Sequence, residues 1–221
     1  TLADTIKSGV RFSIQNVFSL AIQIIDILEK LHHHDPPIIH RDIKPSNILL
    51  EPDGKDYKVY LTDFGAVYNP LLQRGGSTIA GTYGYMSPEQ LMGMCTPASD
   101  IYSLGMTAVH MLTEEPPWKM PVEGLKIQYE PILRKVRPDL NESVLNLLRM
   151  MTDASLDNRI GSASEILDFL EKIKGTIEQK EQQDKIIPLN RMKYFIVNHP
   201  FLFCICTFFG GLGLCQLIKR K

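Results

Sequence analysis

The chain has 221 residues, of which 44% are hydrophobic and 22% charged, and its formal net charge is -1. This composition is ordinary for a globular protein that buries a core, and the balanced charge excludes a global electrostatic attraction to nucleic acid. The first residues, "TLADTIKSGVRFS", contain no charged region followed by an apolar core, which excludes a secretory signal peptide. Three of the four cysteines lie in one apolar segment near the end, so there is no disulfide framework or metal spacing, as expected in a reducing compartment.

A helical period begins shortly after the N-terminus. Apolar residues recur at helical spacing, and Ser13 before them is a plausible N-cap. The residues that follow this period are Val17, Leu20, Ala21, Ile24, Ile27, Leu28 and Leu31.

Three consecutive histidines, His32, His33 and His34, follow this segment and precede "DPP". They resemble a metal-binding cluster, but they stand where the predicted helix ends. We expect them to be solvated or capping residues, with metal binding as the alternative.

The next segment combines a polar loop with a predicted hairpin. "PDG" at residues 52–54 is a turn signal, and "YKVYLTD" at residues 57–63 is rich in strand-forming residues. Because a hairpin brings its ends together, Asp42, Asn47 and Asp63 should converge. Hard oxygen ligands of this kind suit Mg²⁺ shared with substrate phosphates. A second carboxylate that accepts a hydroxyl proton and a lysine, Lys44, that neutralises phosphate charge complete a set suited to phosphoryl transfer.

Helical patterns return after a glycine-containing irregular segment, at residues 98–113, 141–152 and 162–173. We therefore expect a mainly α protein with one short β-hairpin. The polar residues of the predicted site lie around that hairpin.

The C-terminal part divides into two segments. Residues 174–193 are charged and glutamine-rich, as in a linker. The 25 residues from Tyr194 to Ile218 contain no Asp, Glu, Lys or Arg. We expect residues 194–221 to form a membrane anchor with a transmembrane helix at about 199–218, since about 20 apolar helical residues cross the hydrocarbon core. The alternative is a buried helix of a soluble domain.

The motifs around the polar loop resemble those of eukaryotic-type serine/threonine protein kinases. "HRDIKPSN" (residues 40–47) is similar to the catalytic loop, "DFG" (63–65) to the magnesium motif, and "SPE" (87–89) to the end of the activation segment. The resemblance covers residues 1–173, the C-terminal lobe of a kinase, and its wording leans towards bacterial members. Further matching segments are "GTYGYMSPEQ" (81–90), "SDIYSLG" (99–105), Trp118 after "EEPP", and "DNRIGSASEILDFL" (157–170).

The resemblance implies a role for each matching residue. Asp42 would be the catalytic base, Lys44 would contact the transferred phosphate, and Thr82 would hydrogen-bond both. Asn47 and Asp63 would hold Mg²⁺, with ATP as the donor and a protein serine or threonine as the acceptor. Lys44 at its position marks serine/threonine rather than tyrosine specificity.

Other matching residues would have structural roles. His40 and Phe64 would stack in the hydrophobic spine. Glu89 and Arg159 would form a buried ion pair, which is costly to break on one side only. Asp100 would hold the backbone of the catalytic loop from the central helix.

Arg41 suggests a regulatory hypothesis. Kinases with arginine before the catalytic aspartate are often activated by phosphate in the segment that here spans residues 63–89. A phosphate on Ser77 or Thr78 would pair with Arg41 and order that segment. The alternative is that Ser77 and Thr78 are only polar loop residues.

The glycine-rich loop and the strand lysine of the family's N-terminal lobe do not occur in these residues. We therefore expect a fragment that transfers phosphate poorly alone. The alternatives are a pseudokinase, which commonly lacks one of the two aspartates, and a membrane adaptor. ATP chemistry places the kinase lobe in the cytoplasm, although Lys219 to Lys221 on the far side of a single span conflict with the positive-inside tendency, and a segment that dips into the membrane and returns is the alternative.

Overall fold

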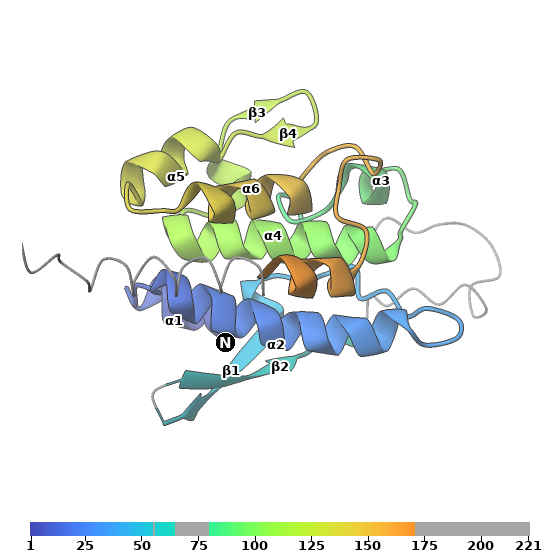
Figure 1. The fold of residues 1–221 in the computed structure, drawn as a ribbon, viewed down its shortest axis with the longest axis horizontal. Helices are drawn as coiled ribbons and strands as arrows, with labels where there is room; N and C mark the ends of the chain where they lie inside the picture. Colours follow the sequence, from blue (N-terminus) through green and yellow to red (C-terminus); the bar gives the residue numbers. More distant parts are fainter. Residues whose placement is uncertain (55, 65–79, 171–221) are drawn as a thin grey trace, which may run out of the picture. The chain divides into compact units, whose positions relative to one another are not determined.

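The computed structural model describes residues 1–54, 56–64 and 80–170. Within these residues the chain is mainly helical, as predicted, with two small antiparallel hairpins (Figure 1). The helices are α1 (Leu2–Lys7), α2 (Ile14–His32), α3 (Pro88–Leu91), α4 (Pro97–Thr113), α5 (Glu130–Val136) and α6 (Glu142–Met151), and residues 163–170 are also helical. The strands are β1 (Ile48–Asp53), β2 (Asp56–Leu61), β3 (Val122–Glu123) and β4 (Lys126–Ile127), and short 3-10 turns span Pro45–Asn47 and Pro117–Lys119.

Helix α2 begins at the predicted cap. The backbone N–H of Asn16 donates to the Ser13 hydroxyl at 3.0 Å, which satisfies one of the free N–H groups of the first turn. One face of the helix is buried, as the apolar period predicts. The buried residues on this face are Val17, Leu20, Ile24, Ile25 and Leu28.

Among the described residues, helix α4 lies between α2 on one side and α6 on the other (Figure 1). It is buried from Ala98 to Thr113, so it presents no solvent-facing side. Gly105 lets α6 approach closely, because a Cβ atom there would lie 2.7 Å from a methyl carbon of Thr152 and 3.0 Å from the Cβ of Met151. Any larger residue would force these two helices apart.

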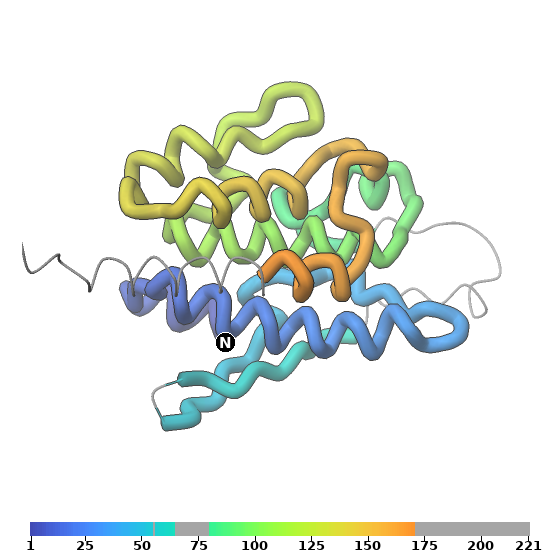
Figure 2. The backbone as a smooth tube through the Cα atoms, viewed as in Figure 1, coloured from blue at the N-terminus to red at the C-terminus, as the bar shows by residue number. Residues whose placement is uncertain are grey.

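The β1–β2 hairpin packs against α2, and the Gln23 side chain of α2 also hydrogen-bonds its backbone. The Gln23 amide donates to the carbonyl of Tyr57 at 2.9 Å and accepts from the N–H of Val59 at 3.1 Å. This pairing imitates a neighbouring strand and satisfies two backbone groups of β2. In Figure 2 the hairpin lies below α2 and at an angle to it, and β1 begins directly after the polar loop.

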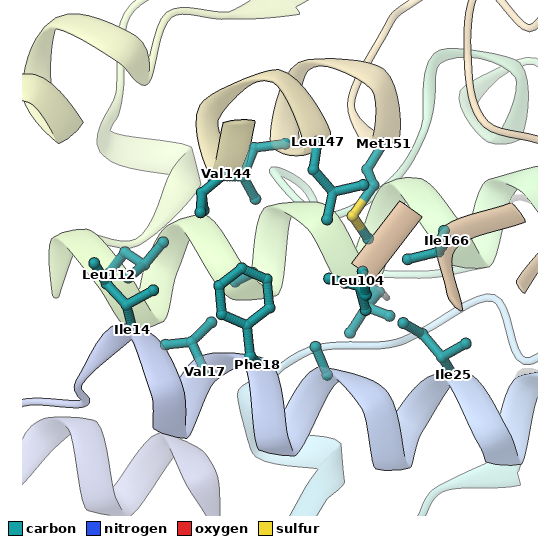
Figure 3. A pocket seen from close by; sticks show the side chains of 14 residues that line it. Ile14, Val17, Phe18, Ile25, Leu104, Leu112, Val144, Leu147, Met151 and Ile166 are labelled. Atoms are coloured by element: carbon teal, nitrogen blue, oxygen red, sulfur yellow. The ribbon is translucent and has the colours of Figure 1, made fainter. Parts of the chain in front are cut away.

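A small apolar cavity of about 30 Å³ lies between α2, α4, α6 and the helical residues 163–170 (Figure 3). The side chains of Phe18, Leu104, Leu147 and Ile166 are among those that line it. None of its lining side chains carries a polar group that could hold a water or a reacting molecule. The cavity is thus a packing gap, and the chemistry of the protein lies elsewhere.

The predictions for the linker (174–193) and the anchor (194–221) fall outside the described residues. Within residues 1–54, 56–64 and 80–170, no helix has the length and apolar character needed to cross a membrane. Ser77 and Thr78 also lie outside the described residues.

Candidate active site

The backbone of residues 40–47, called loop 40–47 below, is hydrogen-bonded to helix α4. The N–H groups of His40 and Arg41 donate to the two carboxylate oxygens of Asp100, each at 2.9 Å. Asp100 is fully buried, so these charge-assisted hydrogen bonds are shielded from water. The predicted contact between Asp100 and the loop backbone is confirmed.

His32 also binds Asp100, and here the prediction was wrong. Its Nε2 lies 2.9 Å from the Asp100 carboxylate, and only 7% of its side chain is exposed. The last turn of α2 directs this histidine towards α4, while His33 and His34 are exposed and contact nearby backbone carbonyls, as expected of capping residues. One carboxylate thus joins α2, loop 40–47 and α4.

Asp42, Lys44 and Thr82 form a closed triangle of hydrogen bonds. The Lys44 ammonium lies 2.6 Å from an Asp42 oxygen and 2.6 Å from the Thr82 hydroxyl, and Thr82 donates to the other Asp42 oxygen at 2.8 Å. These are the predicted contacts of Thr82 with both residues. A lysine ammonium and a threonine hydroxyl together hold the Asp42 carboxylate in one orientation.

Asn47 fixes the far end of the loop against Asp42. Its amide nitrogen donates to the Asp42 carbonyl at 2.8 Å and to the carboxylate at 3.0 Å. Because the nitrogen is committed to Asp42, the amide oxygen points away from it. This oxygen accepts from the Ser46 hydroxyl at 3.3 Å and has a second lone pair for a cation.

Asp63 lies just after strand β2, which pairs with the strand that follows loop 40–47. The N–H of Thr62 donates to the Asn47 carbonyl at 2.9 Å, and Asp63 is the next residue, with an exposed side chain. The hairpin register, in which Ile48 pairs with Leu61, therefore carries Asp63 to the same end of the sheet as Asn47. Both are oxygen donors of the kind that Mg²⁺ prefers.

Two residues of the site have backbone conformations that side chains rarely adopt. Arg41 has φ = 68° and Asp63 has φ = 62°. Non-glycine residues held in this region cost about 1–3 kcal/mol each, and such strain clusters at functional sites. At Arg41 the surroundings compensate, because Asp100 binds its N–H and Gln90 donates to its carbonyl.

Gln90 is a site residue that the sequence reading missed. Its amide nitrogen donates to the carbonyl of Arg41 and, at 2.6 Å, to that of Ala80, which ties loop 40–47 to the returning chain. Gly81 has φ = 126°, and a Cβ there would lie 2.8 Å from the Arg41 carbonyl oxygen. The only sequence signal was the place of both residues inside "GTYGYMSPEQ".

His40 and Phe64 are in contact, but edge to face rather than stacked. Their ring centroids are 5.0 Å apart at an interplanar angle of 65°. His40 is buried and binds the Thr62 carbonyl, whereas Phe64 keeps 47% of its surface exposed. The His40 imidazole therefore connects loop 40–47 to the backbone at Thr62.

Glu89 and Arg159 form the predicted buried ion pair. The guanidinium donates to both carboxylate oxygens, at 2.7 and 2.9 Å, and Ser99 donates to Glu89 as well. Burial by itself raises the pKa of Glu89, but hydrogen bonds led by Arg159 outweigh it and hold the pKa below the ordinary value. The pair connects the end of the 80–90 segment to the chain after α6.

Arg41 remains a candidate for phosphate recognition. Arg41 as a whole residue is 3% exposed. Because Ser77 and Thr78 are outside the described residues, the pairing stays a hypothesis.

A carboxylate tied to a lysine and a threonine, beside an asparagine and an aspartate at a hairpin end, has the donor and acceptor groups that phosphoryl transfer requires. The family described as "Protein kinase domain" matches residues 1–173. The chain belongs to the protein kinase family.

Curated relatives include serine/threonine-protein kinase C of Synechocystis sp., which is 42% identical over 122 residues, or 53% of this chain and 22% of that protein. A probable serine/threonine-protein kinase of Clostridium perfringens is 33% identical over 202 residues, or 84% of this chain and 28% of that protein. The crystal structure of the Mycobacterium tuberculosis PknI kinase domain matches with a TM-score of 0.57 at 22% identity, over 77% of this chain and 60% of that one, which shows the fold. The chain thus spans 22% of the first relative's length and 28% of the second's.

Proposed function

We propose that this chain forms the catalytic lobe of a serine/threonine protein kinase that transfers the terminal phosphoryl group of ATP to protein hydroxyls. The observation that carries the proposal is the hydrogen-bonded triangle of Asp42, Lys44 and Thr82. The similarity to serine/threonine kinases of bacteria and plants supports the same activity.

The residues present can do the following chemistry. Asp42 accepts a hydrogen bond from the substrate hydroxyl and orients its oxygen for attack on the phosphorus. Lys44 holds Asp42 in place and neutralises negative charge on the transferred group. As the bond to the incoming oxygen forms, the bond to the leaving ADP oxygen breaks, and Asp42 takes the hydroxyl proton.

Mg²⁺ fits the donor set at the hairpin end. Asn47 would offer its amide oxygen and Asp63 its carboxylate, which are hard ligands without an all-protein cage. When bound there with ATP, the ion would neutralise charge on the phosphate oxygens.

The pseudokinase alternative lacks support in these residues. Asp42, Asn47 and Asp63 are all present, and Asp42 and Asn47 have the contacts that a catalytic role requires. A purely structural use of the loop would not require the charged triangle around Asp42.

Metal removal tests the proposal on the full-length gene product. We expect transfer from ATP to a serine or threonine peptide in Mg²⁺, and none once the metal is chelated. Asn47→Ala should raise the Mg²⁺ concentration for half-maximal transfer by about tenfold or more, since even residues outside the direct ligand shell change metal affinity 10–100-fold. The matched control is Asn158→Ala, at an exposed asparagine away from the loop. Full activity in the presence of chelator would contradict the metal role.

We also propose that residues 194–221 attach the protein to a membrane as a single-pass anchor, with the kinase lobe in the cytoplasm. The uncharged run from Tyr194 to Ile218 supports this. The full-length gene product should remain in the membrane pellet after alkaline carbonate washing, and a version without residues 194–221 should be released. Release of the intact protein would rule out a span. A reporter fused after Lys221 would show on which side the end emerges.

A further inference from the structure

A pocket of about 380 Å³ opens beside the triangle of Asp42, Lys44 and Thr82. Lys44 and Thr82 form one wall of it, and Ile6 and Lys7 of α1 form another. The remaining wall is aromatic, with Tyr85, His110 and Trp118. We call this site the Trp118 pocket. Since two of its residues bind Asp42 directly, it is continuous with the proposed reaction centre.

The aromatic wall is held rigidly. The Tyr85 hydroxyl lies 2.6 Å from Nδ1 of His110, and the Trp118 ring contacts both, with centroids 6.0 Å and 6.3 Å away and edge-to-face geometry. Behind the aromatic wall, Gly84 allows the two chain segments to approach closely, because a Cβ there would lie 2.9 Å from the backbone nitrogen of Trp118. Tyr85 is buried, whereas Trp118 exposes 49% of its surface, so its ring is accessible to another molecule.

The charges around the pocket disfavour a basic side chain. Burial lowers the pKa of His110 to about 4, so its imidazole is neutral at pH 7. Among the described residues that line the pocket, the one carboxylate, Glu114, is paired with Arg11 at 3.1 Å. The cations that line it are Lys7 and Lys44. An arginine or lysine entering here would lose hydration without gaining a free carboxylate.

We propose that the Trp118 pocket selects protein substrates that carry an aromatic or branched aliphatic residue within about three positions of the accepting serine or threonine. This inference rests on the proposed kinase function. An extended chain advances about 3.2–3.4 Å per residue, so a substrate hydroxyl at Asp42 places a close neighbour over the adjoining pocket. Apolar burial against Tyr85 and Trp118 then supplies the selectivity.

The experiment is a peptide library phosphorylated by the full-length gene product. Each position from four before to four after a fixed acceptor is varied in turn. We expect one position to favour Phe, Leu or Ile over Arg by about tenfold or more in kcat/KM, the size typical of an apolar subsite. Trp118→Ala should reduce this preference to about twofold or less, while Trp118→Phe should keep most of it.

A matched control is Leu125→Ala, which removes an equally exposed apolar side chain that does not line the pocket. It should keep the preference. Phosphorylation with no preference at any position, a preference for basic residues, or a preference unchanged in Trp118→Ala would overturn the inference.

A second readout separates this inference from the proposed function. If no peptide is phosphorylated, the proposed function fails, and the pocket is judged by binding alone. Fluorescence anisotropy of the Asp42→Asn protein should show tighter binding of a Phe-containing peptide than of its Arg counterpart. Equal binding of the two would overturn the inference whatever the activity.

Discussion

Replacing Asp42 with asparagine should lower single-turnover phosphoryl transfer by about 10²–10⁴-fold, the range for loss of a positioned general base. The variant removes the ionised oxygen that would take the hydroxyl proton. It keeps the shape of the side chain, and its amide oxygen still accepts from one of the donors around it. Since Asp42 lies in the loop rather than in the apolar core, the fold should persist, as circular dichroism would show.

The control for this variant is Asp53→Asn, which removes the same charge from an exposed position at the tip of the β1–β2 hairpin. It should transfer phosphate at the unmodified rate. If Asp42→Asn were as active as Asp53→Asn, Asp42 would not be the base, and the proposed function would lose its main support.

The second large effect concerns stability. Arg159→Ala should lower the free energy of unfolding by about 3–5 kcal/mol, because the Glu89 carboxylate would remain buried without its partner. Glu89 is 5% exposed and Arg159 is 5% exposed, so water cannot replace the lost contacts. Urea unfolding followed by circular dichroism measures the change.

An exposed ion pair in the same chain provides the comparison. Arg134 lies 3.0 Å from Glu142, with about half of each side chain exposed. Arg134→Ala should change the stability little, since exposed pairs are screened by water. Equal effects of Arg159→Ala and Arg134→Ala would show that burial of the Glu89 pair adds nothing.

The same pair makes a specific contribution to pH dependence. The pKa of Glu89 is lowered in the folded state, so its contribution is present above the ordinary glutamate pKa and is lost as the pH falls through the lowered value. In the Glu89→Gln variant, the part of the loss of stability at low pH that comes from protonation of this carboxylate should disappear. Urea unfolding at a series of pH values would measure it.

Much of this site could be predicted because its residues are close in the sequence or joined by one hairpin. The spacing of Asp42, Lys44 and Asn47, with Asp63 at the end of a β-rich run, indicated convergence. The contacts at Asp42 agree with that. The period from Val17 to Leu31 and the cap at Ser13 likewise predicted α2, because an amphipathic helix of this length shows its period clearly.

The parts that escaped prediction depend on information that local patterns do not contain. In a run of consecutive histidines the pattern does not say which one faces inward, and His32 does so only because α4 presents Asp100 to it. The helices α3 and α5 are too short to show a period, and β1 begins directly after the motif "HRDIKPSN". Arginine does not indicate a positive φ in the way that glycine does, so the backbone conformation of Arg41 could not be predicted.

Asp100 has a consequence for how the protein loses activity. Because one buried carboxylate binds His32, His40 and Arg41, it joins the end of α2 and loop 40–47 to α4, and we expect these parts to open together. Loop 40–47 should therefore unfold together with the central helix rather than separately. Heating should leave the reaction geometry intact up to the temperature at which the core opens, and both should then fail together.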